Sequence, residues 1–250
     1  MILAIETPQL NQEYPQTISF FGRDVELYVT RIRSLQRKSS LGHRVGEGPV
    51  HLVSFRSDDP TMNGIICVEK QIYPFSANDH ELVAPPKQLE KYNLIRKTGG
   101  IVPDWMCASM DGSSLYIHDL SATDSIEVVD INELLSAPPI RDILSKFPWI
   151  LKKKEIISNQ LAQNFAASAK ANFVCEADSM FLVNHPKNMI VIADFGHGVV
   201  PLSKIGGNPK ISDLLDMNLK RAYNLLDLLN GDFDKLKTLA KQLYAESSDT

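Results

Sequence analysis

Polar and apolar residues alternate along most of the first half of the chain, which is the period expected of β-strands. Residues 16–33 alternate in this way on both sides of a turn signal at 22–24, so they predict a β-hairpin. Further strands are predicted at 50–55, 65–72, 114–120 and 125–131. Two prolines precede a short predicted helix at 87–97, and two glycines follow its end.

The period changes to that of an α-helix in the second half of the chain. Between residues 155 and 173 an apolar residue recurs at about every fourth position, which predicts an amphipathic helix. Two more helices are predicted at 211–229 and 232–243, where apolar residues recur at helical spacing. The short link between them, which contains Gly231, predicts an antiparallel αα-hairpin.

These patterns predict an α+β fold. We expect a mostly antiparallel sheet from the N-terminal half, joined by a late β-hairpin at 181–193 and covered by the C-terminal helices, including the αα-hairpin. Strand patterning gives way to helix patterning near Pro138, which divides the chain into a strand-rich subdomain, 1–137, and a helix-rich subdomain, 138–250. Because the late hairpin returns to strand, one single domain is the alternative.

The charge and the cysteine content disfavour several classes of protein. The formal net charge is −4 and the pI about 5.9, whereas a dedicated nucleic-acid-binding protein carries a basic surplus. Cys67, Cys107 and Cys175 form no C-x-x-C pair, which argues against a disulfide framework or a Cys-rich zinc site and favours a reducing, cytoplasmic location. No apolar run approaches the roughly 20 residues of a membrane span, so we expect no membrane association.

The most suggestive segment is Asp194-Phe195-Gly196-His197-Gly198, directly after an apolar run. A strand that ends in an acid and a histidine places polar groups at a sheet edge, where ligands often bind. Asp194 and His197 are therefore candidates for a metal site or for an acid and base pair. The alternative, which we favour, is that Asp194 caps a tight turn and that His197 is merely exposed.

The Asp-Phe-Gly triplet matches the magnesium-binding segment of protein kinases, but the rest of that motif set is missing. The segment Tyr116-Ile117-His118-Asp119-Leu120 lacks the arginine of the kinase catalytic loop, and no matching asparagine follows it. The glycine-rich loop with a following V-A-I-K lysine is also missing. The sequence therefore does not support assignment to the kinases.

His118 is a second candidate. On a strand, His118 and its neighbour Asp119 point to opposite faces, so only one of them can join a given site without a bulge. A site built from His118, Asp194 and His197 would suit zinc, manganese or iron. No spacing in the sequence indicates that these residues meet.

A basic stretch in the first half is the candidate surface for an anion or an acidic partner. Its residues are Arg31, Arg33, Arg37, Lys38 and Arg44. If Arg31 and Arg33 share a strand face beside the glycine-containing loop, they could meet phosphate or an acidic protein. An edge strand that is protected by charge against self-association explains the same residues equally well.

Three functions follow, and the sequence favours a non-enzyme. The first is a non-catalytic subunit or adaptor that acts through protein contacts, with a protein partner or as a homo-oligomer and without a cofactor. It rests on the lack of a complete catalytic constellation in the sequence. The second is a metal-assisted hydrolase that uses Asp194 and His197 with His118. The third is a nucleic-acid-binding module that uses residues 31–44, which the net charge disfavours.

Overall fold

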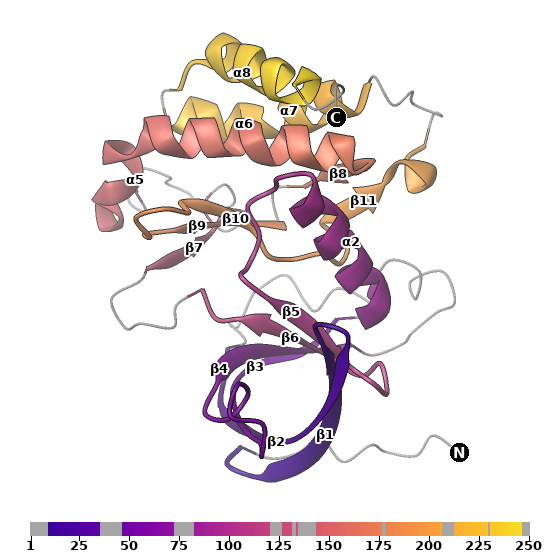
Figure 1. The fold of residues 1–250 in the computed structure, drawn as a ribbon. Coiled ribbons are helices and arrows are strands. Elements are labelled where there is room, and N and C mark those ends of the chain that lie inside the picture. The colour runs from indigo at the N-terminus through magenta and orange to yellow at the C-terminus, as the bar shows by residue number, and fades with distance from the viewer. Residues whose placement is uncertain are drawn as a thin grey trace. The chain divides into compact units, whose positions relative to one another are not determined.

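The computed structural model describes residues 10–35, 47–72, 83–120, 127–131, 134, 144–176, 179–206, 213–229 and 231–246. The chain forms two compact units (Figure 1). The first contains Met1–Leu89 and Asp104–Ala122, and the second contains Glu90–Pro103 and Thr123–Thr250. The seam predicted near residue 137 lies outside the described residues.

Six strands of the first unit close into an antiparallel barrel with the order β1-β2-β3-β4-β6-β5 (Figure 1). The barrel closes because β1 pairs with β2 on one side and with β5 on the other. The strands are β1 (Glu13–Phe20), β2 (Arg23–Ser34), β3 (Glu47–Arg56), β4 (Ile66–Ile72), β5 (Met106–Ser109) and β6 (Ser114–His118).

The barrel core follows from the alternation of apolar residues. Alternate side chains of β2 point inward, so Val25, Leu27 and Val29 are buried between exposed neighbours. The first hairpin turns at Phe21 and Gly22, both with positive φ (48° and 77°), as a two-residue type I′ loop requires. The turn therefore lies one residue before the predicted position.

The second unit combines two small sheets with a helical layer. One sheet has the order β10-β9-β7, and β11 pairs with β8. Helix α6 packs against α7, α8, β8 and β10. The strands are β7 (Val128–Asp130), β8 (Phe173–Cys175), β9 (Met180–Val183), β10 (Ile190–Ile192) and β11 (Val199–Pro201). The helices are α5 (Pro148–Lys152), α6 (Lys154–Lys170), η2 (Leu202–Lys204), α7 (Leu214–Leu228) and α8 (Phe233–Ala245), with α2 (Pro85–Lys97) earlier in the chain.

Two buried asparagines tie strands and loops of the second unit to its helices. Asn164 on α6 accepts a hydrogen bond from the Ile101 amide at 2.7 Å and donates to the Ile190 carbonyl at 3.2 Å. Asn218 on α7 accepts from the Cys175 amide at 2.8 Å and donates to the Phe173 carbonyl at 3.0 Å. Each side-chain amide therefore satisfies one backbone N–H and one backbone C=O group in the interior of the unit.

The α+β class is confirmed, and the sheet arrangement needs correction. The described strands before residue 120 form a closed barrel, whereas the strand predicted at 125–131 corresponds to β7 and shares a separate sheet with the late hairpin, β9 with β10. Alternation in a sequence tells which face of a strand is buried, but it does not tell which strand pairs with which. In the part of the chain that the structure describes, no helix has the length and apolar character needed to cross a bilayer.

Candidate functional site

The segment after β10 is a tight, hydrogen-bonded turn. The Asp194 carboxylate accepts a hydrogen bond from the Gly196 amide at 2.9 Å, and the amides of Ala193 and Asp194 both donate to the Ser179 carbonyl. The side chains of Asp194 and His197 are partly exposed. The structure thus gives Asp194 the turn-forming role that we favoured from the sequence.

Helix α2 holds this segment through a buried lysine, which sequence reasoning missed. The Lys91 Nζ donates to the carbonyls of Phe195 and Gly196, both at 2.9 Å, and Lys91 is 4 % exposed. The next residue on the helix, Tyr92, packs edge-to-face on the buried Phe195 ring with the centroids 5.6 Å apart. A lysine on a helix usually lies on the solvent side, so nothing in the sequence marked this one.

Some elements of this chain occur in the same order as elements of protein kinases. In kinases a strand lysine precedes a helix, and the Asp-Phe-Gly segment follows a later strand. Here the buried Lys70 lies on β4 before α2, and Asp194-Phe195-Gly196 follows β10. The order of a buried strand lysine, a helix and a later Asp-Phe-Gly segment along the chain is therefore the same.

The catalytic loop does not agree. Kinases require a catalytic aspartate and an asparagine five residues after it. In kinases the catalytic loop precedes the Asp-Phe-Gly segment along the chain. We compare it with the link that precedes the β9–β10 hairpin and Asp194, which consists of residues 176–179, of which 177 and 178 are outside the described ones. For an aspartate in this link, the asparagine would fall at residues 181–184, but the only asparagine there is Asn184, and the residue five before it is Ser179. The link therefore cannot carry the pair in its required spacing.

The three residues of the predicted metal site belong to different units of the chain. His118 on β6 lies in the first unit, with its Nδ1 3.6 Å from an Asp104 carboxylate oxygen, whereas Asp194 and His197 belong to the second unit. No group of three or more histidine, cysteine, aspartate or glutamate side chains that could hold a metal occurs among the described residues.

The two described residues of the predicted basic surface, Arg31 and Arg33, lie in different environments. Arg31 is only 1 % exposed and points into the barrel, so it is not on a shared outer face with Arg33, which is exposed. The register shift between Arg31 and Arg33 interrupts the regular alternation of the strand, so the two side chains do not share a face. Arg37, Lys38 and Arg44 lie outside the described residues.

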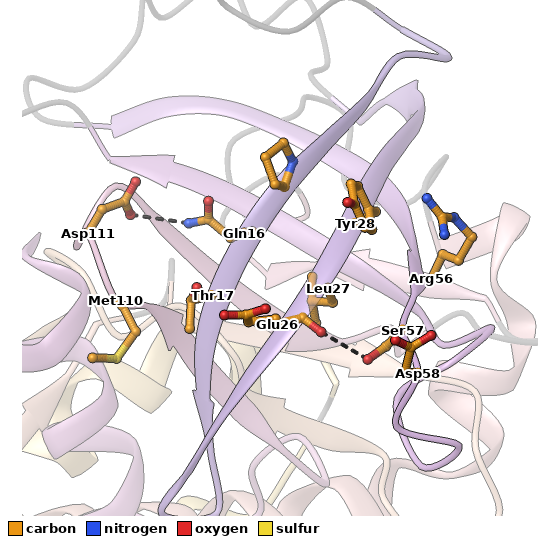
Figure 2. Close-up of a pocket in the computed structure, with 11 residues that line it drawn as sticks. Gln16, Thr17, Glu26, Leu27, Tyr28, Arg56, Ser57, Asp58, Met110 and Asp111 are labelled. Atoms are coloured by element: carbon orange, nitrogen blue, oxygen red, sulfur yellow. Dashed lines mark hydrogen bonds between the residues drawn. The ribbon is translucent and has the colours of Figure 1, made fainter.

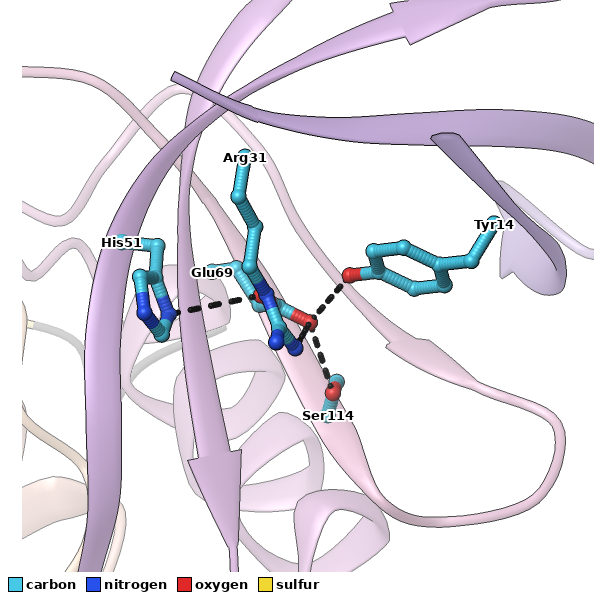
Figure 3. Close-up of polar contacts among 5 residues, drawn as sticks. All are labelled: Tyr14, Arg31, His51, Glu69 and Ser114. Carbon is cyan, nitrogen blue, oxygen red and sulfur yellow. Dashed lines mark hydrogen bonds and ion pairs between the residues drawn. The ribbon is translucent and has the colours of Figure 1, made fainter. Parts of the chain in front are cut away.

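Arg31 belongs to a buried polar cluster inside the barrel, centred on Glu69 (Figure 3). The Glu69 carboxylate accepts from Arg31 Nε at 2.7 Å, Tyr14 Oη at 2.6 Å and Ser114 Oγ at 3.1 Å. His51 Nδ1 lies 3.7 Å from the same carboxylate. Glu69 is wholly buried, so these donors replace the water that it loses.

The protonation of this cluster follows from its burial. Burial and the Glu69 carboxylate raise the pKa of Tyr14, so its hydroxyl stays a donor. Burial and the Arg31 guanidinium lower the pKa of His51 below its ordinary value of 6.5, although Glu69 acts in the opposite direction. Arg31, Tyr14 and Ser114 all donate to Glu69 across the barrel wall, whereas His51 Nδ1 makes no hydrogen bond, and we assign the cluster a structural role.

The three cysteines are buried and free. Burial raises the pKa of all three thiols, that of Cys175 to about 11 and that of Cys107 to about 12. Since the thiolate is the nucleophilic form, none of the three is suited to nucleophilic catalysis.

The outer face of β1 and β2 carries an open groove of about 610 Å³, which we call the β1–β2 groove (Figure 2). It belongs entirely to the first unit. Its lining residues are Pro15, Gln16, Thr17, Glu26, Leu27, Tyr28, Arg56, Ser57, Asp58, Met110 and Asp111. The alternation of polar residues in these strands predicts that this face is exposed to solvent, but it does not predict a groove there.

No protein-family model matches this chain, and no curated protein matches it at a level that indicates homology.

Proposed function

We propose that this chain is a non-catalytic protein that acts through contacts with a protein partner. The observation that carries the proposal concerns the link between β8 and β9, residues 176–179. No aspartate in this link is followed five residues later by an asparagine, which is the pair that phosphoryl transfer by kinases needs. The chain has a strand lysine, Lys70, and an Asp-Phe-Gly segment in kinase order, without that loop. We therefore propose a kinase-like protein that has no phosphoryl-transfer activity.

The environment of the Asp-Phe-Gly segment supports this proposal. In an active kinase the aspartate holds magnesium, and the position of the phenylalanine distinguishes active from inactive states. Here the Asp194 carboxylate accepts a hydrogen bond from the Gly196 amide. The buried Lys91 ammonium donates to the carbonyls of Phe195 and Gly196. A fixed positive charge beside the segment disfavours a divalent cation there.

The other candidate functions have less support. The hydrolase needs three ligands in one place, and the described residues contain no such group. The nucleic-acid-binding function has one fewer candidate contact residue, because the Arg31 side chain is paired with Glu69 inside the barrel.

A direct assay for catalysis tests the proposal. The purified chain is incubated with γ-labelled ATP, magnesium or manganese, and casein as acceptor, in parallel with the Asp194→Asn variant. We expect the wild-type chain to transfer no more phosphate to casein, to itself or to water than the variant does. Transfer that requires Asp194 would overturn the proposal.

A second measurement tests the contact with a partner. The tagged chain is purified from its native cells under mild conditions, and the complex is rebuilt from separately purified components. We expect a defined stoichiometric complex by analytical ultracentrifugation. A monodisperse monomer that retains no protein at any salt concentration contradicts the proposal.

A further inference from the structure

The β1–β2 groove presents carboxylates on both of its sides. Figure 2 shows Asp111 on one side of the two strands and Asp58 on the other, with Glu26 between them. Glu26 and Asp58 are exposed. Partial burial of Asp111 acts to raise its pKa, but hydrogen bonds from Ser109, Ser113 and Gln16 lower the pKa below its ordinary value. The Asp111 carboxylate is therefore charged at neutral pH.

The single cation of the groove is already paired. The Arg56 guanidinium donates to both carboxylate oxygens of Glu13, at 2.9 and 2.8 Å, and lies over the Tyr28 ring at 4.3 Å from its centroid. Its charge is therefore balanced inside the protein, and its stacking fixes the orientation of the ring. The lining consequently has a net negative charge.

Two apolar side chains stand exposed beside these charges. Tyr28 is 44 % exposed and Met110 is 57 % exposed, and Figure 2 shows them on opposite sides of the groove. Aromatic residues and methionine are enriched at protein interfaces, where they supply apolar contact area. Lysine and arginine side chains can lay their aliphatic stems on such surfaces while their charged ends reach carboxylates.

From this charge pattern and these apolar walls, we infer that the β1–β2 groove binds a lysine- or arginine-bearing segment of a protein partner, which lies across β1 and β2. The cationic side chains meet Glu26, Asp58 and Asp111, and their stems pack on Tyr28 and Met110. The inference rests on the proposed function, because it identifies the chemistry of the partner with which the chain would act.

Fluorescence anisotropy tests the inference with two labelled octapeptides, one of alternating lysine and serine and one of alternating glutamate and serine. The test variant is Glu26→Gln/Asp58→Asn. The matched control is Asp24→Asn/Asp227→Asn, which removes the same charge from exposed positions outside the groove. All four changes are on the surface and conserve side-chain size, so folding is expected to be unaffected.

We expect the wild-type chain to bind the lysine peptide, and not the glutamate peptide, at low salt. The groove variant should bind about three- to tenfold more weakly and the control should keep wild-type affinity, because each exposed ion pair contributes little. Equal losses in the two variants, or no binding of the lysine peptide, overturn the inference. Self-association of the wild-type chain that only the groove variant loses also overturns it, since the occupant would then be a second copy.

These results separate the inference from the proposed function. If the partner complex forms with undiminished affinity in the groove variant, the groove is not the binding surface, but the non-catalytic proposal stands. If phosphate transfer depends on Asp194, the non-catalytic proposal fails whatever the peptides do.

Discussion

The two units of this protein bury polar groups by different chemistry. The barrel encloses charge, because the Arg31 guanidinium and the Glu69 carboxylate lie together inside its wall. The second unit encloses the neutral amides of Asn164 and Asn218 and one lysine on backbone carbonyls. A buried ion pair repays its desolvation only if all partners remain in place, whereas an amide carries a much smaller desolvation penalty.

This difference shows where each unit is vulnerable. In the barrel, the loss of one charge leaves the other charge unpaired in a low-dielectric interior. In the second unit, the loss of an amide leaves backbone groups without hydrogen bonds but no buried charge. The barrel should therefore respond more strongly to mutation and to pH than the second unit.

The largest effect is expected from Glu69→Gln. The change conserves size but leaves the buried Arg31 without its counter-charge, so the free energy of unfolding should fall by about 3 to 5 kcal/mol. Urea unfolding measures it, with Glu26→Gln on the exposed face of the same barrel as control. If both variants lose the same small amount, the interior charge pair is not a major contributor to stability.

Asn218→Ala tests the neutral counterpart in the second unit. It removes the acceptor of the Cys175 amide and the donor to the Phe173 carbonyl, and should cost about 2 to 4 kcal/mol because both groups stay buried. Asn159→Ala on the exposed face of α6 is the control. A loss larger than that of Glu69→Gln would reverse the contrast between the two units.

Lys91→Met tests the mixed case, a charge held by neutral carbonyls. The variant keeps the length of the side chain but withdraws the donor from Phe195 and Gly196, and we expect about 1 to 3 kcal/mol of destabilisation. Hydrogen exchange of the amides at 194–198 should accelerate, while Lys97→Met, which removes an exposed lysine of the same helix, should leave it unchanged. Unaltered exchange in Lys91→Met would show that the turn holds itself.

The smallest effect concerns pH and is specific to the barrel. Because the folded-state pKa of His51 is below 6.5, the unfolded chain binds a proton first as the pH falls. The contribution of His51 to the free energy of unfolding is fully present above pH 6.5. It decreases as the pH falls toward the folded-state pKa. Unfolding curves between pH 7.5 and 5 should show this slope in the wild type and a weaker one in His51→Gln. Equal slopes would remove His51 as the cause.

Part of this architecture could be predicted from local patterns. The apolar repeat at 155–173 corresponds to α6, and the alternation at 16–33 corresponds to β1 and β2. These predictions succeed because each depends on the periodicity of one segment. Closure of the barrel depends on the pairing of β1 with β5, about 90 residues apart in the sequence, and no local pattern encodes that pairing.

The candidate site shows the same limit. The turn at Asp194 was predictable because aspartate and glycine form turns through their own backbone neighbourhood. The burial of Arg31 has a signal in the sequence, because Arg31 continues the inward parity of Val25, Leu27 and Val29 along β2. Lys91 carried none, because its partners are two carbonyls more than 100 residues away.

Barrel closure also bears on how the protein avoids unwanted aggregation. Its first strand, β1, covers the free sides of both β2 and β5. A chain shortened by that single strand would present two bare rows of amide and carbonyl groups at once, and each row is a template for recruiting extended segments from other molecules. Strand β1 therefore leaves neither β2 nor β5 with an unpaired edge. Proteolytic removal of β1 would expose both edges and make the protein prone to fibril-like aggregation.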